Sequence, residues 1–260
     1  MLTFRNTSTV FLLSLLTLNL LNVFIGISGW WYALPLGLYS IVIMWGSSKV
    51  DSNFHFKVYC KGETDEKLVA LTFDDGPDPE LTPQVLDVLN KHGVTAAFFC
   101  IGKKMDAAPE LTKRIIDEGH VLGTHTYSHG NWFDMYAPWT MRKDIMKAAD
   151  AAFNATGLRP LLFRPPYGVT NPNLRLALRK TPFLSVGWSI RTLDTVKSDH
   201  DKIASRMKEL HPGDVILLHD TTKGIAKLLD ESIINIKNSG FKIARADTLL
   251  NIKAYENYES

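Results

Sequence analysis

Two adjacent carboxylates and two histidines are the residues of this chain best suited to chemistry. Asp74 and Asp75 follow the apolar run 68–73, and His125 and His129 frame the segment HTYSH. Burying one carboxylate costs several kcal/mol unless a cation compensates its charge, so two in succession require a positive partner. Taken alone, these carboxylates fit a solvated turn equally well, because Asp-Gly-Pro is a turn signal.

The two histidines are further candidate ligands for a metal ion. Residues four apart on a helical turn face the same side, which is the spacing of metal-binding pairs. Together with Asp75, the residues His125 and His129 form a set of two imidazoles and one carboxylate. Such a set leaves coordination positions open for water and substrate, as catalytic zinc sites do. We therefore predict one divalent metal on these three residues, which would polarise a carbonyl and its attacking water.

Hydrolysis at such a metal also needs a base and an acid. Asp74, directly before the predicted ligand, is placed to take the proton of the water. Arg164 closes another apolar run and is expected to pair with Asp74 and set its pKa. His219, in the segment LLHD, is the candidate general acid, and Asp194 is its candidate orienting partner.

An oxyanion stabiliser is expected in the motif RPPYG. Pro165 and Pro166 restrict the backbone there, so the N–H of Tyr167 is predicted to point toward a developing oxyanion. Asp220 follows the candidate acid directly. Because neighbouring strand residues point to opposite sides, Asp220 is expected to serve the structure.

Apolar runs and helical stretches alternate along most of the chain. Strands are predicted over 68–73, 96–101, 120–124, 161–163, 183–188, 214–218 and 241–244. Helices are predicted from Thr82-Pro83 to Gly93 and over 110–118, 140–156, 172–179, 201–210 and 222–238. This alternation predicts a parallel sheet with outer helices. No G-x-G-x-x-G follows the first strand, which disfavours a dinucleotide-binding sheet. An open doubly wound sheet and a barrel both stay possible, and we expect an α/β barrel of about seven parallel strands, with the reactive residues at the C-terminal strand ends.

The first 48 residues are expected to form a membrane anchor outside this barrel. Residues 10–28 and 29–46 carry no charge, and a membrane helix needs ~20 apolar residues. Trp30, Trp31 and Tyr32 suit a membrane interface. Two transmembrane helices are thus favoured over a cleaved signal peptide, whose apolar core is ~7–15 residues. Residues 49–66 are then a linker, 67–252 the catalytic domain and 253–260 a tail.

Charge bears on partners and orientation. The net charge is +2 and no basic run occurs, so no nucleic-acid partner is expected. Arg5 and Lys49 flank the apolar windows, and by the positive-inside rule both ends would prefer the cytoplasm. Large domains cross membranes largely regardless of charge, so an extracytoplasmic domain is expected and a cytoplasmic one stays open. Cys60 and Cys100 are expected as buried or semi-exposed free thiols, and a disulfide between them stays open. The oligomeric state is also open.

The segments TFDDGP, HTYSH, RPPYG and LLHD occur in this order and resemble the motifs of the polysaccharide deacetylase family. This family is also called the NodB-homology domain or carbohydrate esterase family 4. The resemblance covers roughly residues 65–250. It implies a distorted barrel of seven strands, one divalent metal and hydrolysis of acetyl groups on amino-sugar polymers. The metal is implied to be Zn²⁺, with Co²⁺ or Ni²⁺ as alternatives.

The resemblance also implies a role for each matching residue. Asp74 matches the base and Arg164 the residue that orients it. The other matching positions are the metal ligands Asp75, His125 and His129, the acid His219 with its partner Asp194, the oxyanion-binding amide of Tyr167, and a substrate pocket of Pro166, Trp188 and Leu217.

One motif departs from the family pattern W-x-x-D-x-x-D-W. Arg191 replaces the first Asp, Asp194 keeps the second, and Thr195 replaces the final Trp. The missing Trp would reduce the apolar wall around the acetyl methyl group, so the preferred substrate is open. The leading hypothesis is a membrane-bound N-deacetylase of a cell-envelope polysaccharide, peptidoglycan or chitin-like. Alternatives are an O-acetyl esterase on the same site and a non-catalytic glycan-binding membrane protein.

Overall fold

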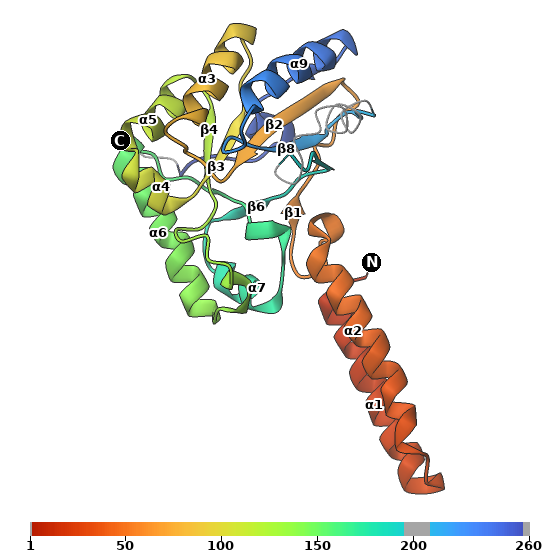
Figure 1. The fold of residues 1–260 in the computed structure, drawn as a ribbon. Helices are drawn as coiled ribbons and strands as arrows, with labels where there is room; N and C mark the ends of the chain where they lie inside the picture. The colour runs from red at the N-terminus through yellow and green to blue at the C-terminus, as the bar shows by residue number, and fades with distance from the viewer. Residues whose placement is uncertain (1, 195–208, 257–260) are drawn as a thin grey trace.

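The computed structural model describes residues 2–194 and 209–256 of the 260. Within them, a long helical hairpin extends from an α/β domain (Figure 1). The hairpin consists of α1 (Phe4–Ile25), a short 3-10 helix (Gly29–Tyr32) and α2 (Ala33–Ser48). α1 has no buried residue, and Gly46 is the buried residue of α2. The apolar side chains of the hairpin therefore lie exposed outside the core of the domain.

The two hairpin helices differ in length. At ~1.5 Å per residue, the 22 residues of α1 span about 33 Å, which matches the ~30 Å hydrocarbon layer of a bilayer. Of the described residues, α1 alone forms a helix long and apolar enough to cross a membrane. The 16 residues of α2 span about 24 Å. Polar contacts join the two helices, including Tyr32 Oη to Asn19 Oδ1 at 3.3 Å and Ser8 Oγ to Tyr39 Oη at 3.0 Å.

The domain is built on one sheet whose strand pairs are all parallel. The strand order is β1-β6-β5-β4-β3-β2-β8-β7, and β9 also pairs with β2. The strands are β1 (Val58–Tyr59), β2 (Leu68–Asp74), β3 (Ala97–Cys100), β4 (Val121–Thr124), β5 (Leu162–Phe163), β6 (Leu184–Val186), β7 (Ile190–Arg191), β8 (Val215–His219) and β9 (Lys242–Ile243). The predicted parallel α/β barrel is confirmed. The described residues hold nine strands rather than seven, because β1 and β7 are too short to show as apolar runs.

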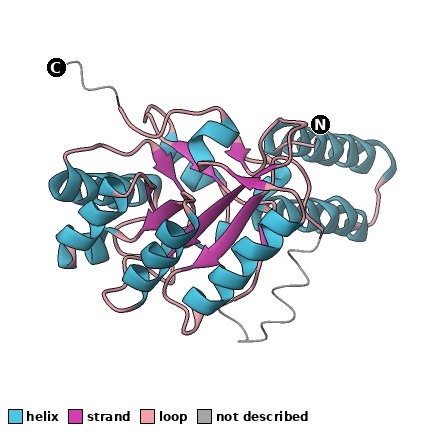
Figure 2. Ribbon diagram, turned by 90° about the horizontal axis from the view of Figure 1, so that it is seen from above, coloured by secondary structure: helices cyan, strands magenta, loops and turns pink. Residues whose placement is uncertain are grey.

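Helices surround the strands, as Figure 2 shows. They are α3 (Leu81–His92), α4 (Gly102–Ala107), α5 (Pro109–Asp117), α6 (Pro138–Thr156), α7 (Pro172–Leu178), α9 (Ile225–Asn238) and α10 (Ala246–Leu250). α4 and α10 were not predicted from the sequence. α3 begins at Leu81, one residue before the predicted start, and the Asp78 carboxylate accepts from the backbone amides of Glu80 and Leu81 there. The predicted helix over 201–210 lies largely outside the described residues.

β2 is the central strand of the core. Its residues Val69 to Asp74 are all buried, because neighbouring strands and helices cover both faces. Leu71 and Phe73 belong to a cluster with apolar side chains of α3 and α9, and Phe73 stacks on Phe98 with 5.0 Å between ring centroids. A strand buried on both faces gives a firmly packed base for the residues at its end.

The segment 49–66, predicted as a linker, contributes to the fold. It buries Val50, Phe54, Val58 and Cys60, and its strand β1 pairs with β6. The Thr170 amide donates to Ser47 O at 3.0 Å, which attaches the end of α2 to the domain. The described cysteines, Cys60 and Cys100, are both buried free thiols, as favoured from the sequence.

Candidate active site

The C-terminal strand ends bring the predicted residues together. Asp74 ends β2 and lies opposite His219 of β8 in the strand register. β4 leads directly into His125, and β5 leads into Arg164. Because these strands are neighbours in one parallel sheet, residues far apart in sequence meet at one edge.

Asp74 and Asp75 face the same site because the backbone turns sharply between strand and loop. Asp75 has φ 73°, in the left-handed region that costs a residue with a side chain roughly 1 kcal/mol or more. Lys104 Nζ donates to Asp75 O at 2.7 Å, and the Ile101 amide donates to Gly76 O at 2.8 Å. These bonds hold the turn, so the alternation of strand side chains does not separate the two carboxylates.

The predicted ligands Asp75, His125 and His129 converge. One donor atom from each lies within 4.8 Å of the others. Asp75 Oδ1 is 3.4 Å from His129 Nε2 and 3.7 Å from His125 Nε2, and this oxygen is buried with no hydrogen-bond donor. A buried carboxylate oxygen facing two imidazole nitrogens fits a divalent cation.

His125 is held in the tautomer that a metal ligand needs. Its Nδ1 lies 2.8 Å from Arg164 O, which can only accept, so Nδ1 carries the proton and Nε2 presents its lone pair. Burial, together with the neighbouring His129, lowers the pKa of His125 to about 3. The imidazole is therefore neutral at physiological pH.

His125 and His129 do not share a helical turn, as their spacing suggested. Residues 125–130 form a loop in which Thr126 and His129 have φ 63° and 46°. Asp144 of α6 holds this loop by accepting the amides of Tyr127 at 2.7 Å and Ser128 at 3.3 Å. Asp144 was not predicted as a site residue, because nothing in the sequence distinguishes it from the other polar residues of a long amphipathic helix.

Arg164 and Asp74 form a buried ion pair. Arg164 Nη1 lies 2.7 Å from Asp74 Oδ1, and both side chains are almost fully shielded from solvent. The same guanidinium donates to Thr72 Oγ1, Val186 O and Gly187 O, and it lies 4.0 Å above the Phe99 ring. Since Asp74 Oδ1 is engaged, the other oxygen of Asp74 faces His125, at 3.9 Å from Nε2.

Burial governs the electrostatics of this pair. Burial raises the pKa of Asp74 although the Arg164 charge opposes it, and burial lowers the pKa of Arg164. An arginine keeps its charge under any physiological condition. The ion pair therefore fixes the carboxylate in position, and burial makes it more basic than a carboxylate in water.

His219 is paired with Asp194, as predicted. The two side chains meet at 2.8 Å through His219 Nδ1 and Asp194 Oδ1, and the His219 amide donates to Asp194 Oδ2 at 2.8 Å. Burial opposes the charged imidazole, but Asp194 outweighs it, so the pKa of His219 lies above its ordinary value. Leu193 before Asp194 has φ 61°, a further strained residue at the site.

The predicted pocket residues border the same edge. Tyr167 has φ 58° and its ring lies 5.2 Å from that of His129. Leu217 is buried two residues before His219 on β8, so the two side chains share one face of the strand. Trp188 lies 5.7 Å from the Arg164 guanidinium, and a Cβ at Gly168 would overlap its ring, which places Trp188 against the Pro166–Gly168 turn. Thr195 lies outside the described residues.

Asp220 has a structural position, as expected. Its Oδ2 accepts from Thr82 Oγ1 at 2.5 Å, and a Cβ at Gly76 would overlap the carboxylate. Burial raises the pKa of Asp220 to about 7. The carboxylate thus lies beneath the turn that carries Asp75 rather than beside His219.

A parallel α/β barrel with a carboxylate-histidine cluster at its C-terminal edge defines a class of hydrolases that use a bound metal ion. Comparison with known proteins is consistent with this class. A family model described as polysaccharide deacetylase matches residues 61–186. This chain belongs to the polysaccharide deacetylase family, as the relatives below show. The family is metal-dependent in general, and the described residues contain a candidate site for such an ion.

Several relatives cover most of the domain. The chain is 38% identical over 184 residues to a peptidoglycan-N-acetylglucosamine deacetylase of Bacillus cereus, covering 69% of this chain and 66% of that protein, just under two thirds of its length. It is 32% identical over 200 residues to the peptidoglycan-N-acetylmuramic acid deacetylase PdaA of Bacillus subtilis, covering 75% and 76%. A crystal structure of a peptidoglycan N-acetylglucosamine deacetylase superposes with TM-score 0.70 at 34% identity, covering 76% of this chain and 94% of that one. The predicted hydrolase family is confirmed.

Proposed function

We propose that this protein is a metal-dependent deacetylase that removes N-acetyl groups from amino sugars of a cell-envelope polysaccharide. The convergence of Asp75, His125 and His129 beside the buried Asp74 carries this proposal. The relatives named above are deacetylases of N-acetylglucosamine or N-acetylmuramic acid in peptidoglycan. Peptidoglycan is therefore the first substrate to test.

The donor set suits a borderline metal ion. Two imidazoles and one carboxylate favour Zn²⁺, with Co²⁺ and Ni²⁺ as alternatives that accept the same ligands. When bound, the ion would polarise the acetamide carbonyl and lower the pKa of the attacking water. Every other step falls to side chains of this chain.

Asp74 is the proposed base. Its free oxygen faces the metal-ligand cluster, while Arg164 holds the other oxygen at 2.7 Å. The carboxylate accepts one proton as the water oxygen bonds to the acetyl carbon. The backbone amide of Tyr167 is proposed to donate to the oxyanion that forms.

His219 is the proposed acid. With Nδ1 on Asp194, its Nε2 is left to donate a proton to the sugar nitrogen as the carbon–nitrogen bond breaks. The products are acetate and a free amine on the sugar. Leu217, Trp188 and Pro166 are proposed to enclose the acetyl methyl group, and Arg191 borders Trp188 at 5.8 Å where the family pattern has an aspartate.

The hairpin is proposed to lie in a membrane. α1 is long enough to cross a bilayer, and α2 pairs with it as a shorter second segment. Both ends of the hairpin then lie on the side of the domain. We place that side outside the cytoplasm, where peptidoglycan lies, although Arg5 and Lys49 favour the cytoplasm by the charge rule.

Acetate release tests the proposal directly. Full-length protein is assayed with N-acetylglucosamine oligomers, peptidoglycan and an O-acetylated glycan, with and without a chelator. We expect faster release from N-acetylated substrates, loss of activity with the chelator and recovery with Zn²⁺. Asp74→Asn should reduce the rate at least 100-fold, whereas Asp106→Asn, an exposed carboxylate on α4, should leave it unchanged.

Two outcomes would favour the alternatives. Faster release from the O-acetylated glycan would assign an esterase to the same site. A full biological effect with Asp74→Asn, together with no acetate release by the wild type, would assign a glycan-binding role.

A further inference from the structure

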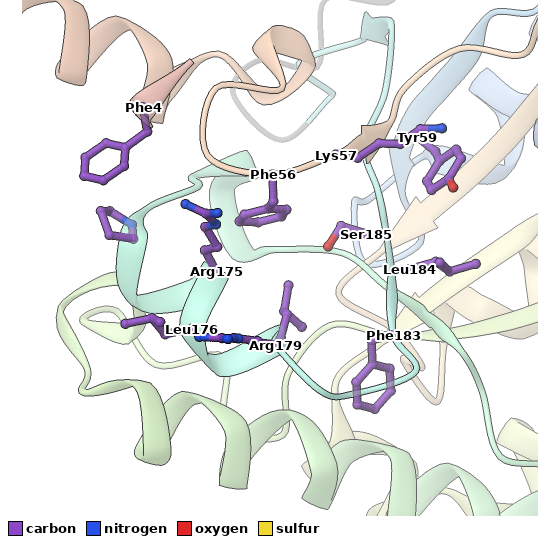
Figure 3. A pocket seen from close by; sticks show the side chains of 12 residues that line it. Phe4, Phe56, Lys57, Tyr59, Arg175, Leu176, Arg179, Phe183, Leu184 and Ser185 are labelled. Atoms are coloured by element: carbon purple, nitrogen blue, oxygen red, sulfur yellow. The ribbon is translucent and has the colours of Figure 1, made fainter. Parts of the chain in front are cut away.

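A cavity of about 790 Å³ lies between the hairpin and the domain, away from the catalytic residues. Figure 3 shows its lining, which comes from the start of α1, the segment leading into β1, helix α7 and the segment leading into β6. Three cations, Lys57, Arg175 and Arg179, line it together with Ser185, and its lining contains no carboxylate. Such a lining suits an anion with several acceptor oxygens.

The three cations are available to a ligand. All three residues are exposed, and none forms an ion pair with another residue in the described part of the chain. Arg175 lies on α7 and Arg179 directly follows the end of this helix, and both side chains line the cavity. Lys57 Nζ rests 4.3 Å above the Tyr59 ring, which holds its position without neutralising it.

The cavity lies at the N-terminal end of α1, where the hairpin meets the domain. Phe4, the first residue of α1, lines it, and the Phe4 amide donates to Phe54 O at 2.8 Å. The charge of Arg175 also reaches this joint, where it adds to burial in lowering the pKa of His55 to about 4. If α1 crosses a bilayer as proposed, its first residue is at the depth of the lipid headgroups, which add ~5–8 Å on each side of the hydrocarbon.

An exposed aromatic patch lies on the neighbouring surface. Trp132, Met135 and Trp139 are 72%, 76% and 76% exposed. Side chains of Asn171 and Asn173 hold this loop against α7 through bonds to Asp134 O and Tyr136 O. In Figure 1, α7 and the adjoining end of α6 lie on the lower side of the domain, the side from which the hairpin projects. Exposed tryptophans beside cations are typical of surfaces that rest on a membrane interface.

We propose that this cavity binds the phosphate headgroup of an anionic membrane lipid and seats the domain on the bilayer that the hairpin enters. Arg175 and Arg179 would bind the phosphate oxygens, Lys57 would add charge, and the aromatic patch would contact the interface. This inference rests on the membrane location in the proposed function and is independent of the deacetylation chemistry.

Lipid binding to the full chain tests this inference. Protein in neutral detergent is titrated with phosphatidylglycerol or phosphatidylcholine, and bound lipid is counted by native mass spectrometry. We expect one tight phosphatidylglycerol that phosphatidylcholine does not replace. The double variant R175Q/R179Q should bind it about 30-fold more weakly, roughly fivefold for each charge. R175K/R179K should retain most of the affinity, because it keeps both charges.

A matched control removes two cations elsewhere. Lys227 and Lys242 are exposed on α9 and β9, and K227Q/K242Q should bind phosphatidylglycerol like the wild type. If R175Q/R179Q is folded by circular dichroism and binds phosphatidylglycerol as tightly as the wild type does, the proposal is overturned. Displacement of the lipid by inorganic phosphate at equal concentration would also overturn it, because it would assign the cavity to a free anion.

Parallel assays separate this inference from the proposed function. Loss of acetate release with lipid binding intact would remove the deacetylase proposal alone. Recovery of the full chain in the soluble fraction of cells would remove the membrane location and this inference together.

Discussion

Replacing Asp194 with asparagine removes the charge of this side chain and nearly preserves its shape. In the wild type, one oxygen accepts from His219 Nδ1 and the other from the His219 amide, both at 2.8 Å. Asparagine has one acceptor oxygen and one amide that can only donate. One of the two donors of His219 must then face another donor, so the variant loses both the charge and one hydrogen bond.

The size of the effect follows from these contacts. A hydrogen bond to a charged group contributes about 1.5–3 kcal/mol. At 1.36 kcal/mol per unit, removing it should lower the pKa of His219 by about 1–2 units. The same loss in the transition state corresponds to a roughly 10- to 150-fold drop in kcat/KM. His219 must be protonated to act as the acid, so a lower pKa moves the alkaline limb of the rate profile to lower pH.

The assay is acetate release from N-acetylglucosamine oligomers between pH 5 and 10, for the wild type and Asp194→Asn. Asp214→Asn is the matched control. Asp214 is equally buried and also accepts a backbone amide, from His211 at 2.8 Å, but it lies just before β8, at the opposite end from His219. The control should lose stability without moving the alkaline limb. An alkaline limb that stays in place for Asp194→Asn would refute the assignment of His219 as the acid.

Three further changes test other parts of the structure. Arg164→Met should destabilise the protein by about 3–5 kcal/mol in urea unfolding, because it leaves Asp74 as an unpaired buried charge. Asp75→Asn should abolish binding of Zn²⁺ measured by calorimetry, and a chelator should lower the Tm of the wild type but not of this variant. Gly46→Ala should destabilise the joint between hairpin and domain by roughly 1–3 kcal/mol, seen as faster proteolysis near residue 50, because its Cβ would overlap the Phe54 ring.

Controls for these changes come from exposed sites. Arg114 forms an ion pair with Asp87 at 2.6 Å on the surface, so Arg114→Met should cost at most about 1 kcal/mol. An equal cost for the two arginine variants would contradict the importance of burial. Gly37→Ala, at a hairpin position where a Cβ meets no neighbouring atom, should leave proteolysis unchanged. Zinc binding by Asp75→Asn with wild-type affinity would show that the ligand set is wrong.

Periodicity predicted the elements that bury a continuous apolar face. The predicted bounds of β2, β3 and β8 agree with the observed bounds to within two residues, because each strand is an apolar run that is covered on both faces. β1 and β7 were missed because two-residue strands gain their partners only in the folded chain. The segment 49–66 reads as polar in sequence, yet tertiary contacts bury its apolar residues.

The residues of the site were also predicted only in part from the sequence. Residue types and their positions after apolar runs predicted which side chains meet at the sheet edge. They did not predict how, because Asp75 and His129 reach the cluster through left-handed backbone conformations that local bonds stabilise. Asp144 and Lys104 supply those bonds from helices whose sequence shows only ordinary polar residues.

The hydrogen bond from the Thr170 amide to Ser47 O attaches the end of α2 to the domain and limits movement of the domain relative to the hairpin. Thr170 follows the turn that carries Tyr167. The segment 49–66 between the hairpin and the barrel packs against the domain through its buried apolar residues. With the hairpin in a bilayer as proposed, the catalytic edge would keep one position relative to the membrane surface. Only glycan strands that pass close to the membrane, such as newly made ones, would then come within range.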